Sequence, residues 1–252
     1  MKQFANPFTI VILAVMAWSA IKGGAFNSPM DWLMNEVYIL PGIVIGLSFH
    51  EFAHAWMASR CGDNTAKALG RLTINPLAHI DPLGTVILPL LMIFLPAMGP
   101  AGSSLSSFVI GWAKPVPVDP RNYRRGTRDD NLVSVAGPLS NLLLAFITLI
   151  FYKIITAGFA QDQSFADGFS QFLLKLVHIN ILLAWFNMIP IPPLDGSHLL
   201  KNFTRMSHQT YFWLSQWGIW ILIFALNFTP LRKLLVALIL GTVKVMALIL
   251  RL

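Results

Sequence analysis

Long apolar segments constrain this chain more than any other feature, because about 20 consecutive apolar residues can cross a bilayer as a helix. Six windows reach or approach that length, at residues 8–25, 37–59, 132–157, 172–191, 211–227 and 234–250. Apolar residues make up 56% of the 252 residues and charged residues only 12%, against about 25% charged in a soluble domain. This chain has too little charge to cover a water-facing surface, so the sequence predicts an all-α polytopic membrane protein.

The charges between these windows indicate how the chain crosses the membrane. Three loops are rich in Lys and Arg, at 60–82, 114–131 and 198–210. In two others, at 27–36 and 158–171, all the charged residues are acidic. Basic loops stay on the cytoplasmic side. With the N-terminus inside, this rule holds only if the apolar stretch 83–111 enters the membrane and returns, covered by protein or a wet cavity. We therefore expect about six transmembrane helices plus a re-entrant or β-hairpin-like segment between the second and third.

The remaining composition narrows the class of protein. The single cysteine, Cys61, excludes an internal disulfide framework and a thiolate zinc cluster. The net charge of +7 fits cytoplasmic loops and anionic lipid, and we expect no nucleic-acid partner. The first window lacks a clean Ala-x-Ala cleavage site, which favours a retained helix over a cleaved leader.

The chain shows no internal repeat, so we expect one membrane domain over residues 1–252, in a bacterial-type cytoplasmic membrane. The last window fits the rule that basic residues stay inside less well than the others. Arg232 and Lys233 would fall outside if it crosses the membrane. An interfacial helix over 231–252 is therefore an alternative for this segment.

Two carboxylates lie at membrane depth, where an ionisable side chain costs about 3 kcal/mol and indicates function by default. The first is Glu51, within the sequence HEFAH at 50–54. On a helix His50 and His54 share one face, so their imidazoles can bind one Zn²⁺. Glu51 is then placed to take a proton from water. HExxH motifs arise by chance in soluble proteins, but far less often inside an apolar run, which favours a catalytic zinc motif.

Asp195 is the second such carboxylate and the candidate third ligand, since catalytic zinc usually has three protein ligands and one open position. It lies in NMIPIPPLDG at 187–196, whose prolines break the preceding helix and let the aspartate turn inward. Alone, this stretch would be interpreted as a turn at the membrane surface. Beside an incomplete HExxH site, the ligand interpretation is favoured. His198 is a rival ligand, to which we assign a supporting role instead.

Three motifs together resemble the site-2 protease family of intramembrane metalloproteases. They are HEFAH at 50–54, GPLSN at 137–141 and NMIPIPPLDG at 187–196, in the family's order. The resemblance covers roughly residues 37–205, which we expect to form the catalytic core. Two further stretches, GRLTINPLAHIDPLG and FVIGWAKPVPVDP, resemble the small bacterial branch without a PDZ domain.

The resemblance implies a role for each residue of the candidate site. One Zn²⁺ per chain is held by His50, His54 and Asp195. Glu51 is the general base, and Asn187 stabilises the oxyanion. Hydrolysis of a peptide bond in a membrane-embedded or membrane-proximal substrate is the activity that this implies.

The depth of the site indicates how water and substrate would reach it. His50 lies about ten residues before Arg60, or roughly 15 Å below the cytoplasmic surface at 1.5 Å per residue. The site must therefore open to the cytoplasm through a wet cavity. The substrate must be extended, and the segment 112–118 is a candidate edge strand to hold it, or a rigid loop without substrate contact. Asn141 either bonds between helices or lines the cavity.

Other functions are compatible with parts of this pattern. A metal transporter would use His50, Glu51, His54 and Asp195, but residues 39–47 offer no ligand towards the outer face. A catalytically silent scaffold would be expected to lose the base, and Glu51 is intact. The nearest alternative is a membrane-bound zinc peptidase that cuts soluble or signal-peptide substrates at the cytoplasmic face. The sequence indicates neither the substrate nor the oligomeric state.

Overall fold

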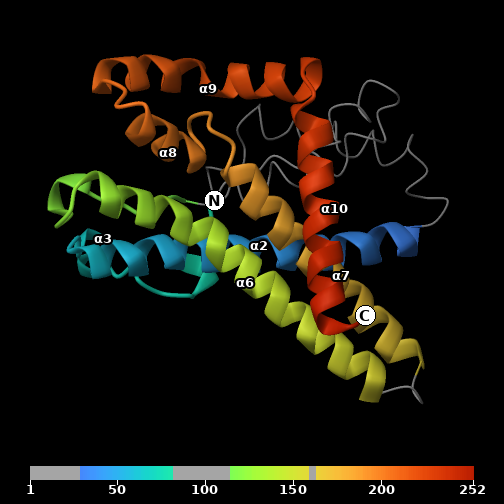
Figure 1. Cartoon of the computed structure of the whole chain (residues 1–252). Helices are drawn as coiled ribbons and strands as arrows, with labels where there is room; N and C mark the ends of the chain where they lie inside the picture. Colours follow the sequence, from blue (N-terminus) through green and yellow to red (C-terminus); the bar gives the residue numbers. More distant parts are fainter. Residues whose placement is uncertain (1–28, 82–113, 159–162) are drawn as a thin grey trace, which may run out of the picture.

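The structure is a computed structural model that describes residues 29–81, 114–158 and 163–252 (Figure 1). Within these residues the chain is helical and has no strand, which confirms the predicted all-α class for this part. The long helices are α2 (Pro29–Cys61), α6 (Thr127–Gly158), α7 (Gln163–Asn187), α9 (His208–Phe228) and α10 (Leu231–Leu250). The short elements are α3 (Thr65–Ala68), η1 (Pro76–Ala78), η4 (Pro120–Asn122) and α8 (Gly196–Phe203).

Four helices in the described residues are long and apolar enough to cross a membrane, at 127–157, 168–187, 208–228 and 231–250. They overlap the last four windows expected from the sequence. The final one has the highest mean hydropathy, 2.3, which favours a span over an interfacial helix. The window 37–59 lies within α2, which is not among the four.

Some of the predicted topology lies outside the described residues. The first window and the expected re-entrant segment at 83–111 both do so, and the total of about six spans stays a prediction. The candidate edge strand at 112–118 is described only from residue 114, and those residues form no strand.

Helices α2, α6 and α7 pack against one another and form the core that positions the candidate site (Figure 1). Helices α6 and α7 lie side by side and run in opposite directions. They bury Ala145 and Leu149 against Val177 and Ile181, and α10 packs on the same cluster. Helix α9 lies across the top of the view in Figure 1 and buries Leu222 and other residues beside the turn that follows α7.

Two glycines let α2 approach α7 closely. A Cβ atom at Gly42 would lie 2.8 Å from Ile179 Cδ1, and one at Gly46 would lie 2.8 Å from Leu183 Cδ1. Small residues four positions apart allow such approach between apolar helices. This contact brings the backbone of α2 within reach of polar side chains on α6 and α7.

Candidate metal centre

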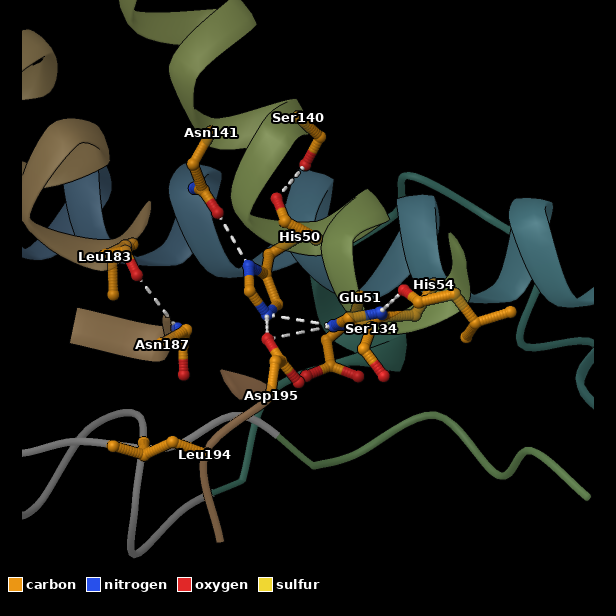
Figure 2. A network of polar contacts seen from close by, with 12 residues as sticks. His50, Glu51, His54, Ser134, Ser140, Asn141, Leu183, Asn187, Leu194 and Asp195 are labelled. Atoms are coloured by element: carbon orange, nitrogen blue, oxygen red, sulfur yellow. Dashed lines mark hydrogen bonds and ion pairs between the residues drawn. The ribbon is translucent and has the colours of Figure 1, made fainter. Parts of the chain in front are cut away.

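His50 and His54 lie one turn apart on α2 and point towards Asp195 (Figure 2). Their Nε2 atoms are 3.0 Å apart. Asp195 Oδ2 lies 3.0 Å from Nε2 of His50 and 3.4 Å from Nε2 of His54. One ligand atom of each residue lies within 4.8 Å of the others, the only such group of three among the described residues. The structure thus brings together the three side chains that the sequence singled out as ligands.

The other nitrogen of each ring shows which tautomer is present. His54 Nδ1 lies 2.7 Å from the carbonyl oxygen of Val133, and His50 Nδ1 lies 2.6 Å from Asn141 Oδ1. Both partners are acceptors, so each Nδ1 donates its hydrogen to that partner, and each imidazole in its neutral, metal-binding form presents a lone pair on Nε2.

Two imidazole nitrogens and a carboxylate oxygen therefore converge. Asp195 Oδ2 is buried and has no hydrogen-bond partner, although it lies beside both imidazoles. Three such donors repel one another unless a cation lies among them. Two imidazoles and one carboxylate form a ligand set typical of catalytic zinc, so the residues fit that metal.

Asp195 reaches the histidines because the chain breaks after α7. The prolines within 190–193 cannot continue the helix, and Asp195 lies at the N-terminal boundary of α8. The turn is so tight that a Cβ at residue 196 would lie 2.3 Å from the carbonyl oxygen of Met188, so Gly196 is required there.

Helix α6 packs directly on the two rings. A Cβ atom at Gly137 would lie 2.4 Å from His54 Nε2 and 2.7 Å from His50 Nε2. The glycine of the GPLSN motif therefore leaves the room that α6 needs to pack against both candidate ligands.

Glu51 has a defined backbone partner. Its Oε2 accepts a hydrogen bond of 2.7 Å from the backbone N–H of Val116. Val116 is buried against Ala55 and Ala66, which places its N–H rigidly. This bond occupies the N–H that a candidate edge strand would offer to a substrate. The second carboxylate oxygen of Glu51 has no such bond among the described residues.

Residues 153–225 match the model of peptidase family M50. The chain is 37% identical over 166 residues to YwhC of Bacillus subtilis (strain 168), which is named as a zinc metalloprotease. The matched region covers 66% of this chain and 68% of the relative. The chain belongs to peptidase family M50. Membership of this family, which includes the site-2 proteases, makes the chain a peptidase and confirms the resemblance seen in the motifs.

Other M50 relatives are more distant. Rip2 of Mycolicibacterium smegmatis is 27% identical over 242 residues, covering 91% of this chain and 83% of the relative. Rip2 of Mycobacterium tuberculosis (strain ATCC 25618 / H37Rv) is 30% identical over 194 residues, covering 77% and 66%. Both are named as zinc metalloproteases. No solved structure matches the chain significantly. The family-model match includes Asn187 and Asp195, whereas the HExxH motif lies before it.

The other residues singled out from the sequence have clear positions in this M50 chain. Asn187 lies beside the cluster in Figure 2, and its Nδ2 donates to the carbonyl of Leu183 over 3.0 Å. His198 Nδ1 lies 3.6 Å from Asp130 Oδ1, so its partner is on α6 and it is not part of the group of three. Asn141 bonds between helices, the first of the two roles considered for it.

Several groups that contact the candidate site were not predicted from the sequence. The carbonyl of Val133 and the N–H of Val116 are backbone groups, which no motif reveals. Asn180 was also missed, although a polar residue inside an apolar run is the signal that drew attention to Glu51 and Asp195. An amide gives a weaker signal because burying it costs less than burying a charge.

Asp63 holds the segment that carries Val116. It is fully buried after α2, and it accepts hydrogen bonds from Thr65 N at 3.0 Å, Asp119 N at 2.7 Å and Asn122 Nδ2 at 3.0 Å. Burial acts to raise the pKa of this carboxyl, but the hydrogen bonds from Thr65, Asp119 and Asn122 outweigh it and hold the pKa below its usual value. The charged form therefore ties the end of α2 to the segment before α6.

Asp63→Asn is expected to lower the free energy of unfolding by about 2 kcal/mol at pH 7, because an amide hydrogen then faces a donor. The folded pKa is depressed, so the stabilisation by Asp63 is complete above its unfolded pKa of about 3.9 and is lost as pH falls below that value. Denaturant unfolding in detergent at several pH values would measure this. Asp119→Asn, at an exposed ion pair with Arg121, is the control and should cost less. A difference between wild type and Asp63→Asn that persists unchanged at pH 3 would contradict the assignment.

Proposed function

We propose that this M50 peptidase is a zinc-dependent intramembrane endopeptidase. It hydrolyses peptide bonds of membrane-embedded or membrane-proximal substrates. The observation that carries the proposal is the convergence of two imidazole lone pairs and the Asp195 carboxylate beside Glu51. The relatives named as zinc metalloproteases support zinc as the metal.

His50, His54 and Asp195 would hold one Zn²⁺ in each chain. When bound, zinc supplies a Lewis acid that lowers the pKa of water and polarises a carbonyl group. Val133 and Asn141 hold the imidazoles from behind, so their Nε2 atoms present lone pairs without reorganisation. The Asp195 side chain keeps 22% of its surface exposed, which leaves one side of the cluster accessible.

Glu51 acts as the general base. Val116 N–H fixes one carboxylate oxygen, and the other is free to take the proton of the attacking water and to return it to the leaving amine. Asn187 uses one amide hydrogen on Leu183 and retains a second. That second hydrogen can donate to the carbonyl oxygen of the substrate as negative charge develops on it.

The site faces the cytoplasm from within a multi-pass protein of a bacterial-type cell membrane. The basic loops at 60–82, 114–131 and 198–210 support this orientation. His50 would then lie roughly 15 Å below the surface, within the bilayer. The partners of this protein are a membrane protein or peptide substrate and the lipid bilayer. A substrate cut at that depth must be locally extended, because a helix hides its carbonyl groups in hydrogen bonds.

Transport is the less favoured use of the same residues. On the outward side of His50, Ile43 and Leu47 are buried in an apolar cluster between α2 and α7. A translocation path needs successive polar sites, and no second group of three ligands occurs among the described residues. A single enclosed group beside a carboxylate base favours catalysis.

The proposal is tested by cleavage of a panel of single-span membrane peptides in liposomes, with zinc content measured on the same samples. We expect one zinc per chain and cleavage within the span, both lost in Asp195→Ala. Cleavage should stop on chelation and return with added zinc. Zinc-bound protein that cuts only soluble peptides would move the assignment to the cytoplasmic face. Purified protein that binds no zinc would overturn the metal centre.

A further inference from the structure

Asn180 is an amide in the middle of α7 that the catalytic roles above do not use. It is fully buried, although its helix is one of the candidate spans. Its Nδ2 donates to the carbonyl oxygen of Leu176 over 2.8 Å, and its Oδ1 accepts from Asn141 Nδ2 over 2.8 Å. A buried amide in an apolar helix is costly unless it is satisfied, and one of these two bonds leads to Asn141, the partner of the candidate ligand His50.

The bond to Asn141 fixes which way the Asn141 amide faces. Both hydrogens on Asn141 Nδ2 are used, one on Asn180 Oδ1 and one on the carbonyl of Gly46 at 3.0 Å. The amide oxygen is left to face His50 Nδ1 at 2.6 Å (Figure 2). A rotated Asn141 would present its NH₂ group to Nδ1, and the ring would then carry its hydrogen on Nε2, where the metal binds.

Two backbone carbonyls set the direction of the whole chain of bonds. Leu176 O accepts only, so Asn180 must present Nδ2 to it and Oδ1 to Asn141. Gly46 O likewise disfavours the rotated form of Asn141, because that form would turn the amide oxygen towards a carbonyl. His54 needs no such relay, because its partner is the carbonyl of Val133, which has only one role.

We propose that Asn180 is a positioning residue of the metal centre, which acts through Asn141 to keep the His50 lone pair directed at the metal. The relay crosses all three core helices, from α7 through α6 to α2. It rests on the proposed zinc site. Without Asn180 one constraint on the Asn141 amide is lost, and the rotated amide competes.

The test measures zinc affinity of the full chain in detergent by competition with a chromophoric chelator. Asn180→Leu removes the acceptor at similar size and is expected to weaken zinc binding about tenfold, at the lower end for partners behind a ligand. The matched control is Thr148→Val, a buried polar residue of α6 whose hydroxyl, among the described residues, donates to the carbonyl of Leu144 on its own helix. It should change zinc affinity less than about twofold.

A double-mutant cycle separates positioning from packing. In an Asn141→Leu background the relay is already cut, so Asn180→Leu should cause no further loss of zinc affinity. A purely structural residue would lower the affinity by the same factor in both backgrounds. The visible spectrum of the Co²⁺-loaded protein should also shift in Asn180→Leu and remain unchanged in Thr148→Val.

Each outcome decides a distinct claim. Wild-type affinity in Asn180→Leu, or equal losses in the two backgrounds, overturns the positioning role and leaves the proposed function intact. Wild-type protein that binds no zinc overturns the metal site itself and the relay with it. Tenfold weaker zinc binding that occurs only when Asn141 is present and is absent in the Asn141→Leu background, together with the cobalt shift, establishes the relay.

Discussion

Glu51→Gln is expected to lower peptidase activity about a thousandfold or more while zinc content stays at the wild-type level. An amide cannot accept and return the proton, whereas the three candidate ligands are untouched. The substitution is isosteric, and its side-chain oxygen can still accept from Val116 N–H, whose bond to Glu51 is 2.7 Å. The fold and the approach to the site should therefore be preserved.

The measurement compares cleavage rates and zinc content of the same purified samples. Glu36→Gln is the matched control, because it makes the same chemical change at the only other glutamate of the chain, also on α2. It should leave the rate within a few-fold of wild type. Zinc-bound Glu51→Gln that cleaves within tenfold of wild type would exclude Glu51 as the base.

The helical repeat made half of the candidate site predictable. His50 and His54 must share a face of any helix that contains them, and Glu51 directly follows His50. Asp195 was predictable for a different reason. A carboxylate beyond a proline break at membrane depth needs a cation or a proton, and the two histidines were an incomplete ligand set. The structure brings the two histidines and the aspartate together.

The groups behind the ligands were not predictable, because tertiary contacts select them. Val133 and Val116 contribute a carbonyl and an N–H, which almost any residue type would also offer, so their roles depend on where the packed segments meet. The pattern of prolines around Val116 indicated an available N–H, and the structure shows that Glu51 already binds it. Gly137 is necessary because there is no room for a Cβ atom there, and this too depends on how α6 crosses α2.

Gly137→Ala is expected to weaken zinc binding by about a hundredfold or more. The new Cβ would lie 2.4 Å from His54 Nε2 and 2.7 Å from His50 Nε2, and real Cβ contacts are essentially never shorter than 3.0 Å. The hydrogen bonds from the Nδ1 atoms to Val133 and Asn141, which also lie on α6, hold the rings against this helix. Either the imidazoles rotate away from Asp195 or α6 moves off α2, and both disrupt the ligand geometry.

Gly42→Ala provides the matched control, since it also replaces a helical glycine at a close contact. Its Cβ would meet Ile179 Cδ1 at 2.8 Å, the end of a flexible side chain that can rotate. Alanine is the better helix former at both positions by about 1 kcal/mol, so propensity alone would stabilise both variants. Zinc titration against a chelator, with unfolding of the metal-free protein as the folding check, should separate them. Folded Gly137→Ala with wild-type zinc affinity would mean that α6 does not press on the ligands at Gly137, and would contradict this account.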